Sequence, residues 1–158
     1  MIPFGGYEMP VWYRSVSEEH QAVRETAGLF DATHMGVFDA SGPYVVEFLN
    51  TVTTNDVSAL AVGQSHYTYF LLPDGSVVDD LMIYRLSAER FMIVVNASNN
   101  DKDWAWLNAV NEGKVRIDEA RPFARIQHPV TLRDLRDPAH GAECRVDMPL
   151  QGPKSRDI

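Results

Sequence analysis

Residues 66–84 read HYTYFLLPDGSVVDDLMIY, and this stretch decides the fold. Two runs rich in aromatic and β-branched residues flank a Pro-Asp-Gly turn, and Asp-Gly is a strong signal for a tight β-hairpin. A loop of two or four residues places Tyr69 opposite Asp80. A loop of three residues would shift the register by one and place Asp79 opposite Tyr69 instead.

The register separates the two neighbouring aspartates. Side chains of adjacent strand residues point to opposite faces, so Asp79 and Asp80 cannot share one environment. We predict the register with the two-residue loop. It gives one face with Tyr67, Tyr69, Val78, Asp80, Met82 and Tyr84, and another with His66, Thr68, Phe70, Val77, Asp79, Leu81 and Ile83.

Two interpretations of Asp80 follow from that register. A carboxylate on an aromatic and thioether surface suits a flat, partly apolar ligand whose polar atoms must be oriented. Partial desolvation would also favour hydrogen bonding to a ring nitrogen. Alternatively, Asp80 is a structural residue that lies at the sheet edge and caps the turn. For Asp79 a structural hydrogen bond is expected.

The rest of the chain predicts an α+β fold with a mostly antiparallel sheet and helices on one face. From His34 to Ala120 the expected order is β-α-β-β-β-α-β. The patterns predict strands in 34–42, 66–73, 76–86, 90–96 and 115–120, and helices in 15–28, 43–52 and 99–113. After Arg121 the periodicity fades and prolines accumulate, which is typical of loops with short strands.

Composition narrows the function classes. The chain has 158 residues, is 45% hydrophobic and carries a net charge of −8, concentrated in residues 1–120. An acidic body argues against nucleic-acid binding. No apolar run is long enough for a membrane span, and the N-terminus does not resemble a secretory signal. Cys144 is the only cysteine, so the cytoplasm is the expected compartment. No metal is expected, because His34 has no second ligand at a suitable spacing.

Several segments together resemble the aminomethyltransferase family, the T-protein of the glycine cleavage system and its relatives. Their order and spacing make the resemblance specific, although each one alone is weak. The segments are PFGGYEMPVWY, EEHQAVRETAGLFDATHMG, FLNTVTTNDV, GQSHYTYFLLPDGSVVDDLMIYRL, VVNASNNDKDWAWL and, further on, LQGP.

The resemblance implies a folate-binding fold of three domains, the first of which is discontinuous. Residues 1–31 resemble the opening piece of that first domain and residues 32–120 the second domain, which carries the hairpin. Residues 121–158 would be an insertion followed by the start of the return to the first domain. The chain is therefore expected to be a truncated N-terminal portion that is inactive by itself.

The resemblance also implies an activity. A T-protein takes the aminomethyl group from the lipoyl arm of the H-protein, releases ammonia and passes the one-carbon unit to tetrahydrofolate. Tetrahydrofolate is then a co-substrate, and lipoylated H-protein is the partner. By position in the family motif, Asp80 is the catalytic residue, orienting a folate nitrogen and supporting charge during transfer. The alternatives are a folate-dependent demethylase of a small methyl donor and a non-catalytic folate-binding module.

Other contacts with the folate are implied for Met35, Tyr67, Met82, Tyr84 and Asn96. Three of these residues share the Asp80 face in the predicted register. Two have a simpler interpretation, since Met35 could pack in the core and Asn96 could cap the following helix.

The stretch 122–148 departs from the family pattern. It contains Arg125, Arg133, Arg136 and Arg145. A solvated loop is the preferred interpretation; altered access to the folate channel or binding of an acidic donor is the alternative.

Overall fold

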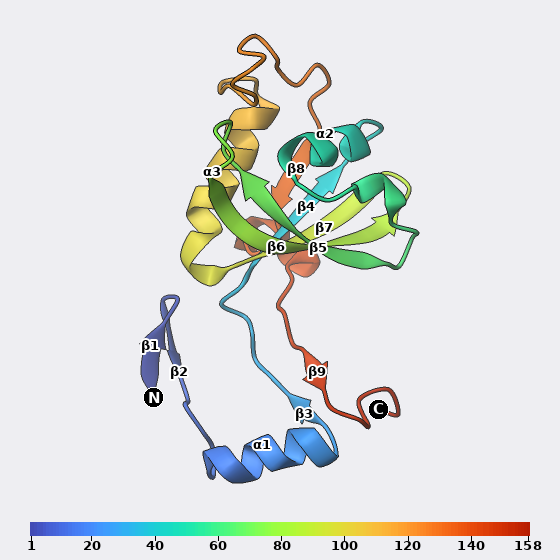
Figure 1. Ribbon diagram of the computed structural model, residues 1–158. Coiled ribbons are helices and arrows are strands. Elements are labelled where there is room, and N and C mark those ends of the chain that lie inside the picture. Colours follow the sequence, from blue (N-terminus) through green and yellow to red (C-terminus); the bar gives the residue numbers. More distant parts are fainter. The chain divides into compact units, whose positions relative to one another are not determined.

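The computed structural model describes residues 1–158 and divides into two units (Figure 1). The sheet unit is Gly36–Arg145. The terminal unit combines Met1–Met35 with Val146–Ile158. The expected boundaries after residues 31 and 120 differ from this division, because residues 32–35 fall in the terminal unit and residues 121–145 in the sheet unit. Assigning the terminal unit to a discontinuous family domain remains a proposal.

The sheet unit is built on one five-stranded antiparallel sheet with the strand order β5-β6-β7-β4-β8. Its chain order, β-α-β-β-β-α-β, confirms the predicted fold class. The elements are β4 (Gly36–Ser41), α2 (Val45–Val52), η1 (Val57–Ala59), β5 (Ser65–Leu71), β6 (Val77–Ser87), β7 (Arg90–Val95), η2 (Ala97–Asn99), α3 (Asn100–Asn111), β8 (Thr131–Asp134) and η3 (Pro138–Glu143).

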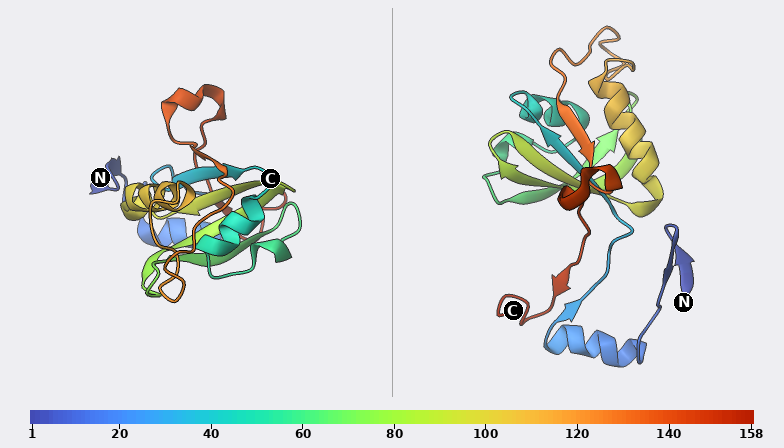
Figure 2. Two further views of the ribbon diagram at one scale, coloured as in Figure 1. Left: turned by 90° about the horizontal axis from the view of Figure 1, so that it is seen from above. Right: turned by 180° about the vertical axis from the view of Figure 1, so that it is seen from behind.

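Both long helices of the sheet unit pack on one face of the sheet. The buried face of α2 consists of Val45, Phe48, Leu49 and Val52, the i, i+3, i+4, i+7 spacing of an amphipathic helix. Leu107 and Val110 of α3 join the same core, together with inward residues of β4, β5, β6 and β7. The short helix η3 lies on the opposite side of the sheet from α2 (Figure 2). No helix of the structure is long and apolar enough to cross a membrane.

The hairpin of β5 and β6 has the predicted register. Tyr69 pairs with Asp80 and Phe70 with Asp79. A bulge then shifts the pairing, so that Leu71 lies opposite Val77. The shift makes two expected positions wrong: Val77 is 61% exposed, whereas Val78 is buried. The extra residue reverses the alternation next to the turn, and Val78 and Asp79 both face the interior.

The expected last strand at 115–120 is wrong in position. That segment forms no strand, and Thr131–Asp134 pairs with β4 instead. Val115 and Ile117 do pack against the core, which explains their alternation. Alternation reports which side chains are buried, but it does not report backbone pairing.

A buried carboxylate links three strands on the other face of the sheet. Asp39 of β4 is fully buried. Arg90 of β7 donates from Nε to Oδ1 at 2.5 Å, and Arg133 of β8 donates from Nη2 to Oδ2 at 3.2 Å. Arg133 also pairs with Glu143 at 2.5 Å. The two arginines supply the compensation that a buried charge needs.

The terminal unit has little interior. It contains α1 (Val16–Glu25), the hairpin of β1 (Ile2–Phe4) and β2 (Tyr7–Met9), and the pair of β3 (Gly28–Leu29) with β9 (Leu150–Gln151). Ser15 caps α1, and its hydroxyl accepts from the backbone N–H of Glu18 at 3.2 Å. No side chain of this unit is fully buried.

The LQGP motif of the terminal unit depends on its glycine. Gly152 has φ of +115°, a conformation that side chains disfavour. A Cβ atom there would lie 2.6 Å from the backbone carbonyl oxygens of Val23 and Thr26. Only glycine allows this approach, and it lets the N–H of Lys154 donate to the oxygen of Thr26 at 2.9 Å.

Candidate functional site

Asp80 lies on the face of the hairpin that the helices do not cover. Tyr67 and Tyr69 on β5 are 48% and 39% exposed, and Met82 and Tyr84 on β6 are half-buried. The rings of Tyr67 and Tyr69 meet edge to face, with centroids 5.4 Å apart. Three sequence-predicted residues, Tyr67, Met82 and Tyr84, therefore share one partly open aromatic and thioether face with Asp80.

Both oxygens of the Asp80 carboxylate accept hydrogen bonds. The hydroxyl of Tyr67 donates to Oδ2, and the side-chain amide of Asn96 donates to Oδ1 at 3.2 Å. The bond to Asp80 raises the pKa of Tyr67 above its usual value. The two donors come from β5 and from the residue that follows β7, so they fix the plane of the carboxylate.

Asn96 joins the two aspartates. Its Nδ2 also donates to the backbone oxygen of Asp80 at 2.9 Å and to Oδ1 of Asp79 at 3.0 Å. Its backbone N–H donates to Oδ2 of Asp79 at 3.1 Å. Asn96 precedes η2, but its side chain makes no capping bond there. Asn96 is thus the N-cap residue of η2 by position, but its side chain is used for the two aspartates and not for capping.

Asp79 is buried, with 3% of its surface exposed. Besides Asn96, the Nδ2 of Asn99 donates to its Oδ1 at 2.6 Å. Burial alone would raise the pKa of Asp79, but hydrogen bonds from Asn96, Asp103 and Asn99 outweigh it and hold the pKa below its usual range. Asp79 thus has the structural hydrogen-bonding role that the register predicts.

Asp103 of α3 is a member of this network that the sequence analysis missed. It is fully buried. Burial, together with the bond to Asp79 and the charge of Asp79, raises the pKa of Asp103 to about 8. A signal existed in the sequence, because Asp103 precedes the buried Leu107 and Val110 at the spacing of one helix face.

Met35 is the one predicted site residue outside the sheet unit. Its backbone N–H donates to the oxygen of Ala32 at 2.9 Å within the terminal unit. Its contact with folate stays a prediction.

The arginines of the stretch 122–148 have partners inside the sheet unit. Arg125 donates to the backbone oxygens of Pro122 and Ala124, and Arg145 to those of Ala142 and Cys144. Arg133 binds Asp39 and Glu143, as described above. The expected solvated loop is thus only part of this stretch, because it also contains β8, which pairs with β4, and η3.

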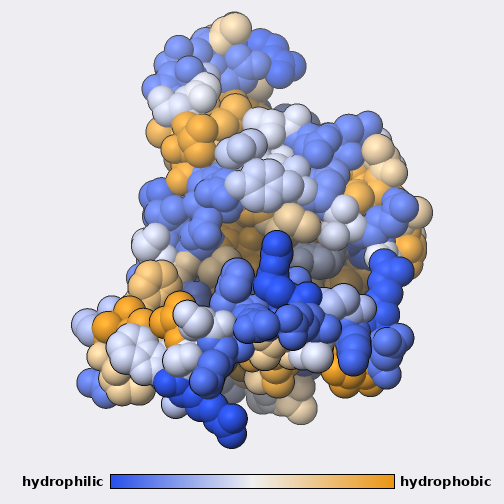
Figure 3. Space-filling model, turned by 60° about the horizontal axis from the view of Figure 1, so that its bottom comes forward, coloured by the Kyte–Doolittle hydropathy of each residue, from blue (hydrophilic) through white to orange (hydrophobic).

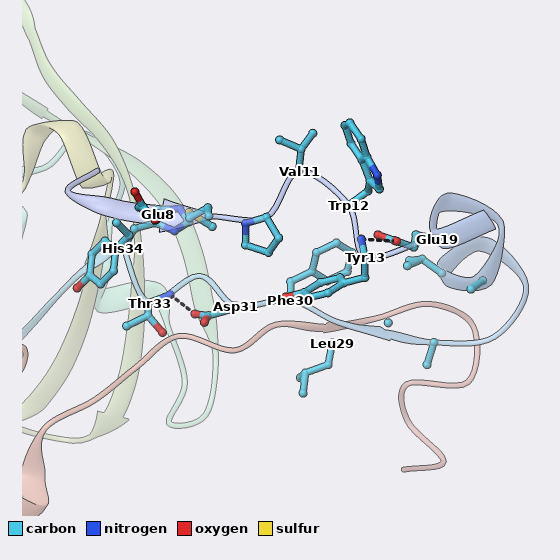
Figure 4. Close-up of a pocket in the computed structure, with 17 residues that line it drawn as sticks. Glu8, Val11, Trp12, Tyr13, Glu19, Leu29, Phe30, Asp31, Thr33 and His34 are labelled. Carbon is cyan, nitrogen blue, oxygen red and sulfur yellow. Dashed lines mark hydrogen bonds between the residues drawn. The ribbon is translucent and has the colours of Figure 1, made fainter. Parts of the chain in front are cut away.

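The terminal unit contains a separate cavity of about 470 Å³. Figure 4 shows it beside Tyr13 and Phe30, with the Tyr13 backbone N–H bonded to Glu19. None of the predicted site residues lines this cavity.

The face in Figure 3 shows hydrophobic groups scattered among hydrophilic ones. We assign the candidate site to Asp80, because a fixed carboxylate and its donors meet there.

The fold and the site define an α+β protein with an oriented, half-buried aspartate on an aromatic hairpin face. The family model described as the GCVT N-terminal domain matches residues 1–158. The chain therefore belongs to the GCVT N-terminal domain family.

Named relatives agree with this membership. An aminomethyltransferase of Symbiobacterium thermophilum is 54% identical over the whole chain, and one of Bacillus subtilis is 50% identical over 117 residues, or 74% of the chain. The solved structure of the glycine cleavage system aminomethyltransferase T from Bartonella henselae has a TM-score of 0.76 and 35% identity, covering 98% of this chain and 37% of its own. The chain spans 38% of the Symbiobacterium relative and 32% of the Bacillus relative.

Proposed function

We propose that the protein acts as a tetrahydrofolate-dependent aminomethyltransferase of the glycine cleavage type. The observation that carries the proposal is the carboxylate of Asp80, which Tyr67 and Asn96 fix on a partly open aromatic face. Family membership and relatives named aminomethyltransferases support the reaction class. The donor would be the aminomethyl group on lipoylated H-protein, and the compartment would be the cytoplasm.

Each part of the face would have a distinct task. Tyr67, Met82 and Tyr84 would contact the pterin ring and its linker, since flat ligands bind between aromatic and apolar side chains. Asp80 would accept a hydrogen bond from a ring nitrogen and stabilise positive charge as the one-carbon unit is transferred. Because two protein donors already fix the carboxylate, little reorganisation would be needed during the reaction. Positioning and electrostatics would then account for the catalysis without a covalent enzyme intermediate.

Replacing Asp80 with asparagine in the natural full-length protein tests the proposal. Asp80→Asn preserves size but removes the charge, so one-carbon transfer from aminomethylated H-protein to tetrahydrofolate should fall by about 10²-fold or more. Ammonia release measures the rate. Glu89→Gln is the matched control, because Glu89 is an exposed acid in the turn between β6 and β7 and should leave the rate unchanged.

Three other outcomes would contradict the assigned residue roles or favour another function. A nearly normal rate for Asp80→Asn combined with an inactive Asp79→Asn would contradict the assigned roles. Stoichiometric folate binding without transfer would favour a binding module. Turnover of a small methyl donor without H-protein would favour the demethylase.

A further inference from the structure

Asp79 and Asp103 form a buried pair of acids between the sheet and α3. Asp79 is 3% exposed and Asp103 is fully buried. The side chains of Asn99 and Lys102 donate to Asp79 and to the backbone oxygen of its neighbour Val78, each at 2.6 Å, so the start of α3 lies against Asp79 and the buried Asp103 is on its first turn. Two neighbouring carboxylates cannot both remain ionised in a buried site. One member of the pair must therefore carry a proton.

The surroundings decide which member carries it. Asp79 accepts three N–H bonds, two from Asn96 and one from Asn99. Such donors stabilise the ionised form. No N–H group donates to either oxygen of Asp103. An ionised Asp103 would thus be buried without a donor, which is much more costly than a neutral acid that donates its own proton.

The nearest cation does not change this assignment. The ammonium group of Lys102 on α3 donates to the backbone oxygen of Val78 at 2.6 Å. Its charge favours ionisation of Asp103, but burial and Asp79 act more strongly in the opposite direction. Across the pair, Asp80 is the other acid of β6, and its carboxylate is turned to the aromatic face.

We propose that Asp103 is a positioning residue, which stays protonated in the native protein and donates its O–H to Asp79, so that Asp79 holds Asn96 against the carboxylate of Asp80. Two observed hydrogen bonds, from Asn96 to Asp79 and from Asn96 to Asp80, would extend the proposed Asp103–Asp79 bond to the candidate site. The link to catalysis rests on the proposed function, whereas the proton on Asp103 does not.

The proton assignment is tested by following the carboxyl carbons of ¹³C-labelled aspartates by NMR against pH. One carboxyl should titrate in the neutral to weakly alkaline range, far above the others, and should vanish in Asp103→Asn. Ionisation of Asp103 already complete at pH 5 would overturn the inference.

The positioning role is tested by two variants of opposite character. Asp103→Asn keeps an N–H donor toward Asp79, and Asp103→Ala removes it. The side-chain amide resonances of Asn96 should keep their shifts in Asp103→Asn and move in Asp103→Ala. Val110→Ala, which opens space on the same buried face of α3 two turns from Asp103, should leave these resonances in place. Equal shifts in all three variants would indicate a merely structural role.

Activity gives a second readout in the natural full-length protein. Asp103→Ala should lower kcat by about 10²-fold through misplacement of Asp80, and Asp103→Asn should restore most of it. In the wild type kcat should decline at alkaline pH as Asp103 loses its proton, and this decline should be absent in Asp103→Asn. If the wild type transfers no one-carbon unit, the proposed function fails, and the Asn96 resonances alone then decide whether Asp103 positions this residue.

Discussion

Replacing Asp103 with asparagine should change how stability depends on pH. The folded-state pKa of Asp103 is about 8, against an ordinary value of 3.8. Between these values the unfolded chain has lost its proton and the folded protein keeps it. The folded state binds more protons, so the free energy of unfolding contributed by Asp103 falls as the pH rises from about 4 through about 8. Asparagine does not titrate and abolishes this decline.

The size of the effect follows from the same values. Each unit of pKa difference corresponds to about 1.4 kcal/mol, so at pH 7 the decline amounts to about 4 kcal/mol. Near pH 4 the variant and the wild type should have similar stability, because both side chains are neutral and of equal size. At pH 7 Asp103→Asn should be the more stable protein by up to that amount. The contribution of Asp79 to the free energy of unfolding has the opposite pH dependence, because its lowered pKa adds stability above about pH 4. This contribution is common to the wild type and to Asp103→Asn.

Urea denaturation at half-unit steps from pH 4.5 to 8 measures this difference. Trp104 and Trp106 lie on α3 beside Asp103 and pack against the core, so their fluorescence reports unfolding of the sheet unit. The difference in unfolding free energy should grow steadily with pH. A difference that is constant over the whole range, or a variant that is less stable at every pH, would refute a protonated Asp103.

Two further predictions concern single structural contacts. Gly152→Ala would force a Cβ atom to within 2.6 Å of two backbone oxygens at positive φ, so the amide hydrogen of Lys154 should exchange faster while amides of β6 are unaffected. Unchanged exchange at Lys154 would contradict the close approach. Replacing both Arg90 and Arg133 with methionine would leave Asp39 buried without a counter-charge and should cost about 3–5 kcal/mol in urea denaturation. Adding Asp39→Leu should recover most of that loss, and no recovery would mean that the arginines stabilise by packing.

The hairpin was predictable because a turn dictates its own register. The Asp-Gly turn fixes how β5 and β6 pair, and alternation then separates Asp79 from Asp80. The bulge at Val77 was not predictable, because it depends on how the first residues of β6 pack against the core. The position of β8 depends on the free edge of β4, a partner that lies far away in the sequence.

The sequence predicts those site residues that local strand geometry brings together, but not those that depend on packing between distant elements. Asp80, Tyr67, Met82 and Tyr84 share a face through local strand geometry. Asp103 approaches Asp79 because α3 packs on the sheet. A contact between two elements that are distant in the chain leaves no local pattern in the sequence. The sequence does contain the helical spacing that places Asp103 on one face with Leu107 and Val110, but this spacing does not identify its partner.

The absence of fully buried side chains in the terminal unit has a consequence for hydrogen exchange. Without an interior, its backbone hydrogen bonds can open one small group at a time, and such openings do not require global unfolding. Amides of Met1–Met35 and Val146–Ile158 should therefore lose protection while those of β6 and β7 retain it. Proteases acting under native conditions would then cut first in these two segments and leave the Asp80 hairpin intact.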